Sequence, residues 1–243
     1  MLADQERYLE AEAGYRAAIR LIERDYGARS PALAQPLNNL AIVHSRLGRL
    51  RDAEKGYLRS LAIREETDNA PPAALVRINL ARLYSQQGRR AEAQMLLDEA
   101  DQEGPVQPAS LHTRAALLLD LRSYEEAALW AEEARQAWRA GGDAMEAAQA
   151  RAMRGEALRL AGRLGQARLE LAKALEELRD TLGDSHPEVG RVLVAYGQAV
   201  RATGERRRGR KLRAQGRAIL AEAPDRAARE HIVDVGAGYT RSR

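Results

Sequence analysis

Apolar and polar positions follow each other along this chain with the period of an α-helix, in segments that come in pairs. Residues 37–54, LNNLAIVHSRLGRLRDAE, contain one such unit: an apolar stripe, a Gly-Arg turn at Gly48 and the start of a second amphipathic segment. This pattern predicts two antiparallel helices joined by a tight turn. Asn38 and Asn39 lie beside the apolar stripe, although asparagine is a poor helix former because its side chain competes for backbone hydrogen bonds.

The same unit recurs along the chain. Related seven-residue segments begin at residues 6, 48, 88, 122, 162 and 204, at spacings of 42, 40, 34, 40 and 42 residues. The apolar pattern predicts a first helix over about Leu2–Tyr26, and APP at 70–72 and GPVQP at 104–108 interrupt the chain between units. A repeat of this length indicates a solenoid, in which each helix pair buries its apolar face against the next pair.

Small residues recur at fixed distances from each turn. Five positions after the turn start stand Ala11, Ala53, Ala93, Ala127, Ala167 and Gly209, and seven positions before it stand Ala41, Ala81, Ala115, Gly155 and Gly197. Two helices approach closely only where both side chains are small, so we expect these residues to lie between the helices of a pair. The chain has no Phe and only two Trp, which suits a core built from Ala and Leu.

These residues resemble the tetratricopeptide repeat, whose period is 34 residues. The longer periods, LNNLA before the turn and LGDSHPEVG between units are similar to the kinesin light chain-like class. The resemblance implies an all-α fold, a right-handed superhelical solenoid of about eleven antiparallel helices over residues 1–220. First helices of each pair would line a concave face and second helices a convex one. Residues 221–243 are expected to form a C-terminal extension that is partly mobile.

The chain shows no pattern of catalytic residues. None of its four histidines (His44, His112, His186 and His231) has a partner at a metal-ligand spacing such as His-Glu-x-x-His, and it has no cysteine. No phosphate loop, nucleophile elbow or kinase signature occurs. His186 precedes Pro187 where a helix should begin, which favours a structural role there. We therefore predict that the protein is not an enzyme and uses no cofactor.

The resemblance places function in the concave groove. Asn39 and Asn79 each stand nine residues before a turn glycine. In peptide-binding tetratricopeptide domains an asparagine at this location bonds the main chain of a ligand; the alternative is that it only lines the groove. Asn38 has no counterpart in the next repeat, where Ile78 stands, and is expected to be a tolerated polar residue. The full set of predicted groove residues is Asn39, Asn79, Arg82, Ile42, Arg46, Gln86, Arg159 and Arg201.

This mixture of amides and arginines suits an extended or partly acidic peptide, because arginine binds a carboxylate through two N–H groups. The leading hypothesis is a non-catalytic protein–protein interaction scaffold that binds a peptide or protein segment in its concave groove. The partner is not identified by the sequence, and neither is the oligomeric state.

Basic residues are concentrated near the C-terminus, and this uneven distribution of charge suggests an alternative function. Residues 201–243 contain 12 Lys and Arg against 5 Asp and Glu, although the whole chain carries a net charge of only +4. The predicted basic patch is Arg206, Arg207, Arg208, Arg210, Lys211 and Arg213. It is either a charged capping helix or a surface for nucleic acid or an acidic partner. It lacks the interleaved aromatic residues that favour single-stranded nucleic acid.

The N-terminal residues MLADQERYLEAEAGY lack the apolar core of a signal peptide. No apolar run approaches the roughly 20 residues that span a bilayer. By default, these observations predict a cytoplasmic protein without a membrane partner.

Overall fold

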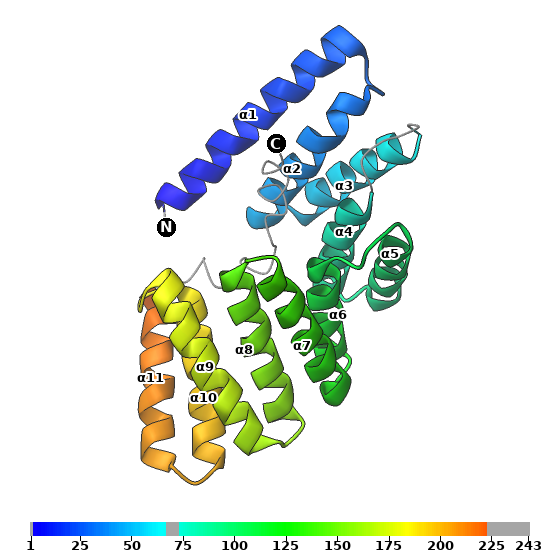
Figure 1. Cartoon of the computed structure of the whole chain (residues 1–243). Coiled ribbons are helices and arrows are strands. Elements are labelled where there is room, and N and C mark those ends of the chain that lie inside the picture. The colour runs from blue at the N-terminus through cyan, green and yellow to red at the C-terminus, as the bar shows by residue number, and fades with distance from the viewer. Residues whose placement is uncertain (1, 67–72, 223–243) are drawn as a thin grey trace. The chain divides into compact units, whose positions relative to one another are not determined.

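The computed structural model describes residues 2–66 and 73–222, which form helices and the short connections between them (Figure 1). The helices are α1 (Leu2–Tyr26), the 3₁₀ helix η1 (Pro31–Leu33), α2 (Ala34–Arg46), α3 (Leu50–Glu65), α4 (Ala74–Gln86), α5 (Arg90–Gln102), α6 (Pro108–Asp120), α7 (Tyr124–Ala140), α8 (Ala144–Leu160), α9 (Leu164–Leu182), α10 (Pro187–Ala202) and α11 (Arg206–Glu222). The described residues contain no strand. The all-α repeat solenoid predicted from the sequence is therefore confirmed.

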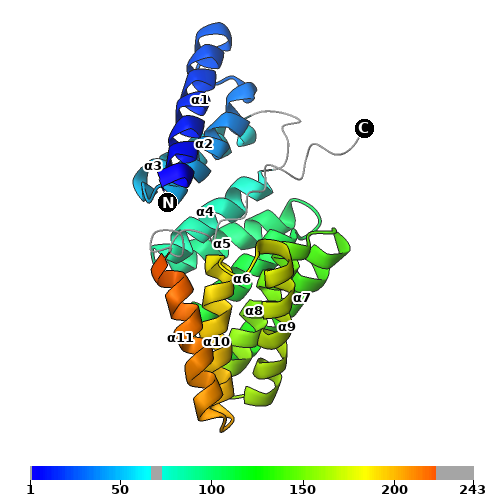
Figure 2. The same cartoon turned by 90° about the vertical axis from the view of Figure 1, so that its left-hand side faces the viewer.

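The described helices divide into two compact units. One unit contains α1 to α5 and the other contains α6 to α11. In the first unit α1 packs on α2, and the pairs α2/α3 and α4/α5 follow. In the second unit the pairs are α6/α7, α8/α9 and α10/α11, and Figure 2 shows α8, α9, α10 and α11 side by side. Most of the expected extension, residues 223–243, lies outside the described residues, and residues 221 and 222 belong to α11.

The residue at each tight turn has a left-handed backbone conformation, with positive φ. Gly48, Gly88, Gly162 and Gly204 have φ of 73°, 77°, 79° and 102°. Arg122 occupies the same place in its repeat with φ of 62°, the one positive φ at a non-glycine residue in the described chain. A side chain disfavours this conformation, so this turn is strained relative to the others. Residue 6, the first of the six repeat positions, has no turn, because α1 continues through it.

Most of the small residues around the turns lie in the core, as the sequence predicts, but Ala11 of α1 is only half-buried. Ala41, Ala53, Ala81, Ala93, Ala115, Ala127 and Ala167 are fully buried. Larger apolar side chains such as Tyr57, Leu97 and Leu193 are also fully buried and fill the space around them. In the last pair, glycines bring the backbones together. A Cβ atom added to Gly197 would lie 2.8 Å from the carbonyl oxygen of Gly209.

Candidate functional site

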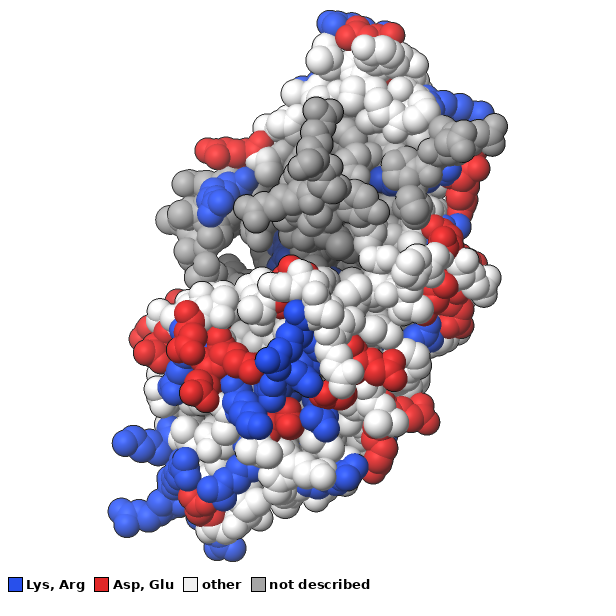
Figure 3. Space-filling model, viewed as in Figure 1, with Lys and Arg blue, Asp and Glu red and all other residues white. Residues whose placement is uncertain are grey.

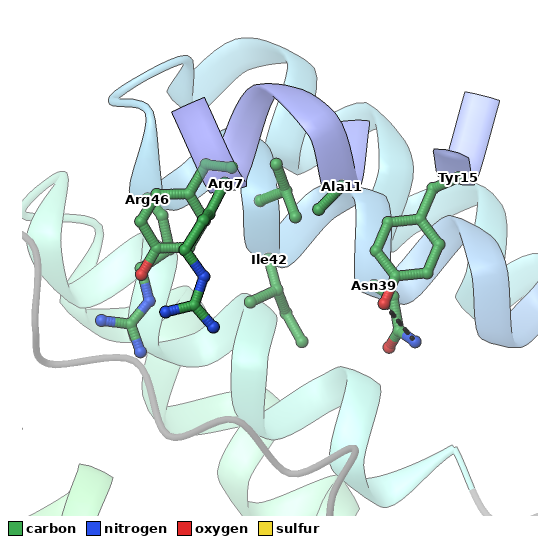
Figure 4. Close-up of a pocket in the computed structure, with 8 residues that line it drawn as sticks. Arg7, Ala11, Tyr15, Asn39, Ile42 and Arg46 are labelled. Atoms are coloured by element: carbon green, nitrogen blue, oxygen red, sulfur yellow. Dashed lines mark hydrogen bonds between the residues drawn. The ribbon is translucent and has the colours of Figure 1, made fainter. Parts of the chain in front are cut away.

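A pocket of about 320 Å³ opens between α1 and α2 in the first unit (Figure 4). Its lining residues are Arg7, Tyr8, Ala11 and Tyr15 of α1 and Asn39, Ile42, Val43 and Arg46 of α2. Residues 7, 11 and 15 are four apart on α1, and residues 39, 42, 43 and 46 are three or four apart on α2, so each helix presents one face. We call this the N-terminal pocket. Three predicted groove residues, Asn39, Ile42 and Arg46, lie in it.

A chain of hydrogen-bonded amides forms one end of the N-terminal pocket. Asn39 Nδ2 donates to the Tyr15 hydroxyl at 3.4 Å. Asn39 Oδ1 accepts from Gln35 Nε2 at 3.2 Å and from Asn38 Nδ2 at 3.3 Å. Asn38 Oδ1 in turn accepts from Asn79 Nδ2 at 3.4 Å. The amide chain therefore links α4, α2 and α1, and it fixes the orientation of the Asn39 side chain.

Asn38 has a larger role than the sequence suggests. It is buried, with 7% of its surface exposed, and it joins Asn79 to Asn39. The expectation of a merely tolerated polar residue is therefore wrong. Asn79 is 2% exposed, so it lies behind the accessible surface and supports Asn38. The signal for this arrangement is the presence of asparagine at both Asn38 and Asn79 in neighbouring first helices.

The other end of the N-terminal pocket is cationic. Figure 4 shows the guanidinium groups of Arg7 and Arg46 at the same end, with Ile42 between them and Asn39. Arg82 of α4 is buried, and the charge of Arg46 acts on its guanidinium. Burial lowers the pKa of the Arg82 guanidinium to about 10; Tyr57 partly offsets this effect and Arg46 adds to it. The positive charges of Arg46 and Arg82 thus both act at this end of the pocket.

The remaining predicted groove residues lie elsewhere. Gln86 is exposed near the end of α4. Arg159 of α8 and Arg201 of α10 belong to the second unit. The Arg159 guanidinium donates to both carboxylate oxygens of Glu156 at 2.8 and 2.6 Å, so its charge is already paired. The predicted groove residues therefore do not form one continuous site within either unit.

The six residues of the predicted basic patch all lie on α11. Arg208 pairs with Glu205 at 3.1 Å and donates to the Tyr196 hydroxyl at 3.3 Å. Arg206, Arg210 and Arg213 line a second pocket together with Arg201 of α10. The predicted groove residue Arg201 therefore lies in the same pocket as three of the six residues of the predicted basic patch.

Two of the histidines have structural roles. His44 Nε2 lies 3.3 Å from Glu12 Oε1, and Arg49 Nη1 donates to the same oxygen at 2.6 Å, which ties α1 to α2 and its turn. His186 Nδ1 accepts from the Glu188 N–H at 3.2 Å and caps α10, as expected. Residues 2–66 and 73–222 contain no group of three or more acidic, histidine or cysteine side chains placed to hold a metal ion. No helix in those ranges combines the length and apolar composition needed to cross a membrane.

Comparison with known proteins shows what the repeats and the fold of this chain resemble. The sequence profile of the tetratricopeptide repeat matches residues 1–66 and 37–100. Tetratricopeptide repeat protein 19 homolog, mitochondrial, from Drosophila melanogaster is 26% identical over 94 residues, which are 39% of this chain and 26% of that protein. The chain therefore matches about a quarter of the length of this relative.

Solved structures share the fold over most of the chain. BtubC (BKLC) from P. vanneervenii superposes with a TM-score of 0.69 at 20% identity, over 90% of this chain and 92% of that one. The nearly identical repeats of a putative kinesin light chain from Podosopora anserina give a TM-score of 0.61 at 21% identity, over 80% and 98%.

YrrB, described as a tetratricopeptide repeat protein with an unusual peptide-binding site, gives a TM-score of 0.52 at 16% identity, over 88% and 97%. At these identities the three structures establish the fold alone. The profile match covers the first 100 residues, and helix pairs of the same kind follow them in the structure. Residues 1–100 of the chain therefore match the tetratricopeptide repeat, and its fold is similar to that of kinesin light chain-like repeats.

Proposed function

We propose that this protein is a non-catalytic interaction scaffold that binds a peptide segment of a partner protein in the N-terminal pocket. The observation that carries the proposal is the composition of that pocket, which has an oriented amide at one end, an aliphatic side chain in the middle and two arginines at the other end. Small-molecule and peptide sites commonly combine an apolar surface with a few placed polar groups. A tetratricopeptide fold that binds peptides, as the description of YrrB states for that protein, agrees with the proposal.

The hydrogen bonds define what the amide end can recognise. Asn39 Oδ1 already accepts two hydrogen bonds, from Gln35 and Asn38, which matches its two lone pairs. Asn39 Nδ2 has two N–H groups and uses one for Tyr15. Among the described residues, the second N–H and the Tyr15 hydroxyl hydrogen have no acceptor, so this end can donate hydrogen bonds. Main-chain carbonyl groups of an extended peptide are suitable acceptors.

The opposite end selects for negative charge. Arg7 and Arg46 point toward the same end of the pocket, and a guanidinium binds a carboxylate through paired N–H groups. Ile42 between the two ends gives an apolar contact for the intervening side chain. The expected ligand is an extended peptide with an acidic residue at one end of the bound segment.

Photo-crosslinking tests this proposal even though the partner is unidentified. Tyr8 lines the pocket, and its replacement by the photo-reactive residue p-benzoylphenylalanine keeps an aromatic side chain there. Tyr26 lies on the same helix, is 74% exposed and is not a lining residue, so the same replacement there is the control. Irradiation in cell extract followed by mass spectrometry should give a defined acidic peptide from position 8 alone. The same products from both positions, or none specific to position 8, would count against the proposal.

A further inference from the structure

A second pocket lies between α10 and α11, within the second unit. It has a volume of about 780 Å³ and is lined by Gln198, Arg201 and Ala202 of α10 and Arg206, Arg210 and Arg213 of α11. Figure 3 shows several basic side chains over the part of the second unit where Figure 1 places α11. We call this the arginine pocket. Four of its six lining residues are arginines.

Helix packing brings these arginines together. Residues 206, 210 and 213 are four and three apart, so they share one face of α11. The close contact of α10 and α11 then places Arg201 beside them. A Cβ added to Gly209 would lie 2.8 Å from the Arg201 Cβ, and one added to Gly197 would lie 2.7 Å from the Arg213 Cγ. The stems of Arg201 and Arg213 therefore cover the glycine contact, and both residues line the pocket.

The arginine pocket lacks an internal counter-charge. None of its lining residues is acidic. Other arginines of the same unit are paired, for example Arg168 and Arg208 with Glu205, and Arg191 with Glu188. Within the part of the chain that the structure describes, no ion pair is formed by Arg201, Arg206, Arg210 or Arg213. Like charges held this close repel one another, and a bound anion would remove that repulsion.

We propose that the arginine pocket is a second binding site, which takes the oxyanion groups of an acidic peptide segment. Carboxylate and phosphate groups share the required chemistry, because both accept paired N–H groups from guanidinium. The Gln198 amide adds one donor and one acceptor for the peptide main chain. The volume of about 780 Å³ accommodates several residues rather than a single ion.

The lining residues favour a peptide over nucleic acid. Proteins that bind single-stranded nucleic acid combine positive charge with aromatic rings on which the bases stack. The arginine pocket has four arginines and no aromatic residue among its lining residues.

Fluorescence anisotropy with three labelled probes tests the proposal. The probes are octaglutamate, a serine peptide with two phosphates and a single-stranded oligothymidylate of eight nucleotides. The pocket variant carries Arg206→Gln and Arg210→Gln, two exposed positions whose loss leaves the glycine contact intact. The matched control carries Arg207→Gln and Lys211→Gln, which remove the same charge from exposed positions of the same helix outside the pocket. Circular dichroism melting confirms that each variant is folded.

The proposal predicts that at least one acidic peptide binds the wild-type protein and binds the pocket variant about tenfold more weakly or worse, since two charged contacts are lost. The control should lose less than about threefold, as expected for diffuse charge alone. The probe that binds more tightly shows whether carboxylate or phosphate is preferred. Equal losses in both variants would overturn the site, and so would failure of both peptides to bind. Binding of oligothymidylate alone would overturn the peptide assignment in favour of nucleic acid.

Discussion

Gly197 of α10 and Gly209 of α11 touch backbone to backbone, and a Cβ added to Gly209 would lie only 2.5 Å from the Gly197 carbonyl oxygen. The same contact recurs one heptad away, where a Cβ on Gly216 would lie 2.5 Å from the Gly190 carbonyl oxygen. The glycines of the last helix pair therefore allow the backbones of α10 and α11 to approach closely.

This contact makes Gly209→Ala destabilising. Alanine normally favours a helix over glycine by up to about 1 kcal/mol. Here the added methyl group would force the helices apart, and overpacking of this kind costs about 1–3 kcal/mol. Thermal unfolding followed by circular dichroism should show a lower midpoint for Gly209→Ala. Gly165→Ala in α9, where a Cβ meets nothing within 4 Å, should leave the midpoint unchanged or raise it. A raised midpoint for Gly209→Ala would refute the close contact.

The strained turn at Arg122 makes Arg122→Gly stabilising. Arg122 has φ of 62°, where a side chain is unfavourable and glycine is not. The gain should be up to about 1 kcal/mol, because glycine's greater freedom in the unfolded chain offsets part of the relief. Urea unfolding measures the change. Gly162→Ala, at the equivalent turn with φ of 79°, should lower the free energy of unfolding by a similar amount. Equal stability of wild type and Arg122→Gly would mean that the turn stores no strain.

Glu132 gives the second unit an acid-sensitive contact. Its carboxylate pairs with Arg135 at 2.5 Å and Arg154 at 3.2 Å, and it accepts from Gln136 at 2.9 Å. Chiefly through the hydrogen bond from Arg135, these groups lower the pKa of Glu132 from 4.5 to about 2. A lowered folded-state pKa stabilises the fold above the unfolded value and loses that effect as pH falls toward the folded value. The contribution should therefore be complete well above pH 4.5 and decline as the pH falls through 4.5 toward 2.

Comparison of Glu132→Gln with wild type isolates this contribution from other carboxylates. Glu132→Gln should be less stable at pH 7, and the difference in melting temperature should shrink between about pH 5 and 2.5 as the wild-type contact is lost. Glu133→Gln changes an exposed neighbour and should show no such convergence. A difference that stays constant with pH would mean that Glu132 is not held ionised by its arginines.

The amide chain predicts that Asn38→Ala is costly. The change removes the acceptor of Asn79 Nδ2, and Asn79 is 2% exposed, so water cannot readily replace it. A buried donor without a partner costs about 1–3 kcal/mol. Gln35→Ala removes an exposed amide that also bonds Asn39 and should cost less than about 0.5 kcal/mol. Denaturant unfolding compares the two, and equal small losses would show that the amide chain contributes nothing to stability.

The repeat architecture could be predicted from the sequence because it depends on short-range patterns. Positions such as Ala53 and Ala93 recur at a fixed distance from the turn, and each must be small for its helix pair to close. The helical period and the turn glycines give the element order. Each of these signals is contained within one helix pair, so the pattern is readable without any contact between distant parts of the chain.

The N-terminal pocket could be predicted only in part. Asn39, Ile42 and Arg46 follow from repeat position, but Arg7, Tyr8 and Tyr15 belong to α1, where the sequence pattern gives no turn from which to count. The role of Asn38 depends on a side chain 41 residues away. The arginine pocket could not be predicted either. From repeat position we expect Arg201 in the groove and the arginines of α11 on a separate surface, whereas the packing of α10 on α11 brings them together.

The central claim is that the N-terminal pocket binds an acidic peptide through Arg46 and Asn39. The most direct test is the affinity of the segment identified by crosslinking at position 8, measured by anisotropy on wild type, Arg46→Gln and the exposed control Arg51→Gln. We predict that Arg46→Gln, once circular dichroism shows it to be folded, binds about tenfold more weakly and that Arg51→Gln stays within about twofold of wild type. Equal affinity of all three proteins, or equal losses in both variants, would contradict the claim.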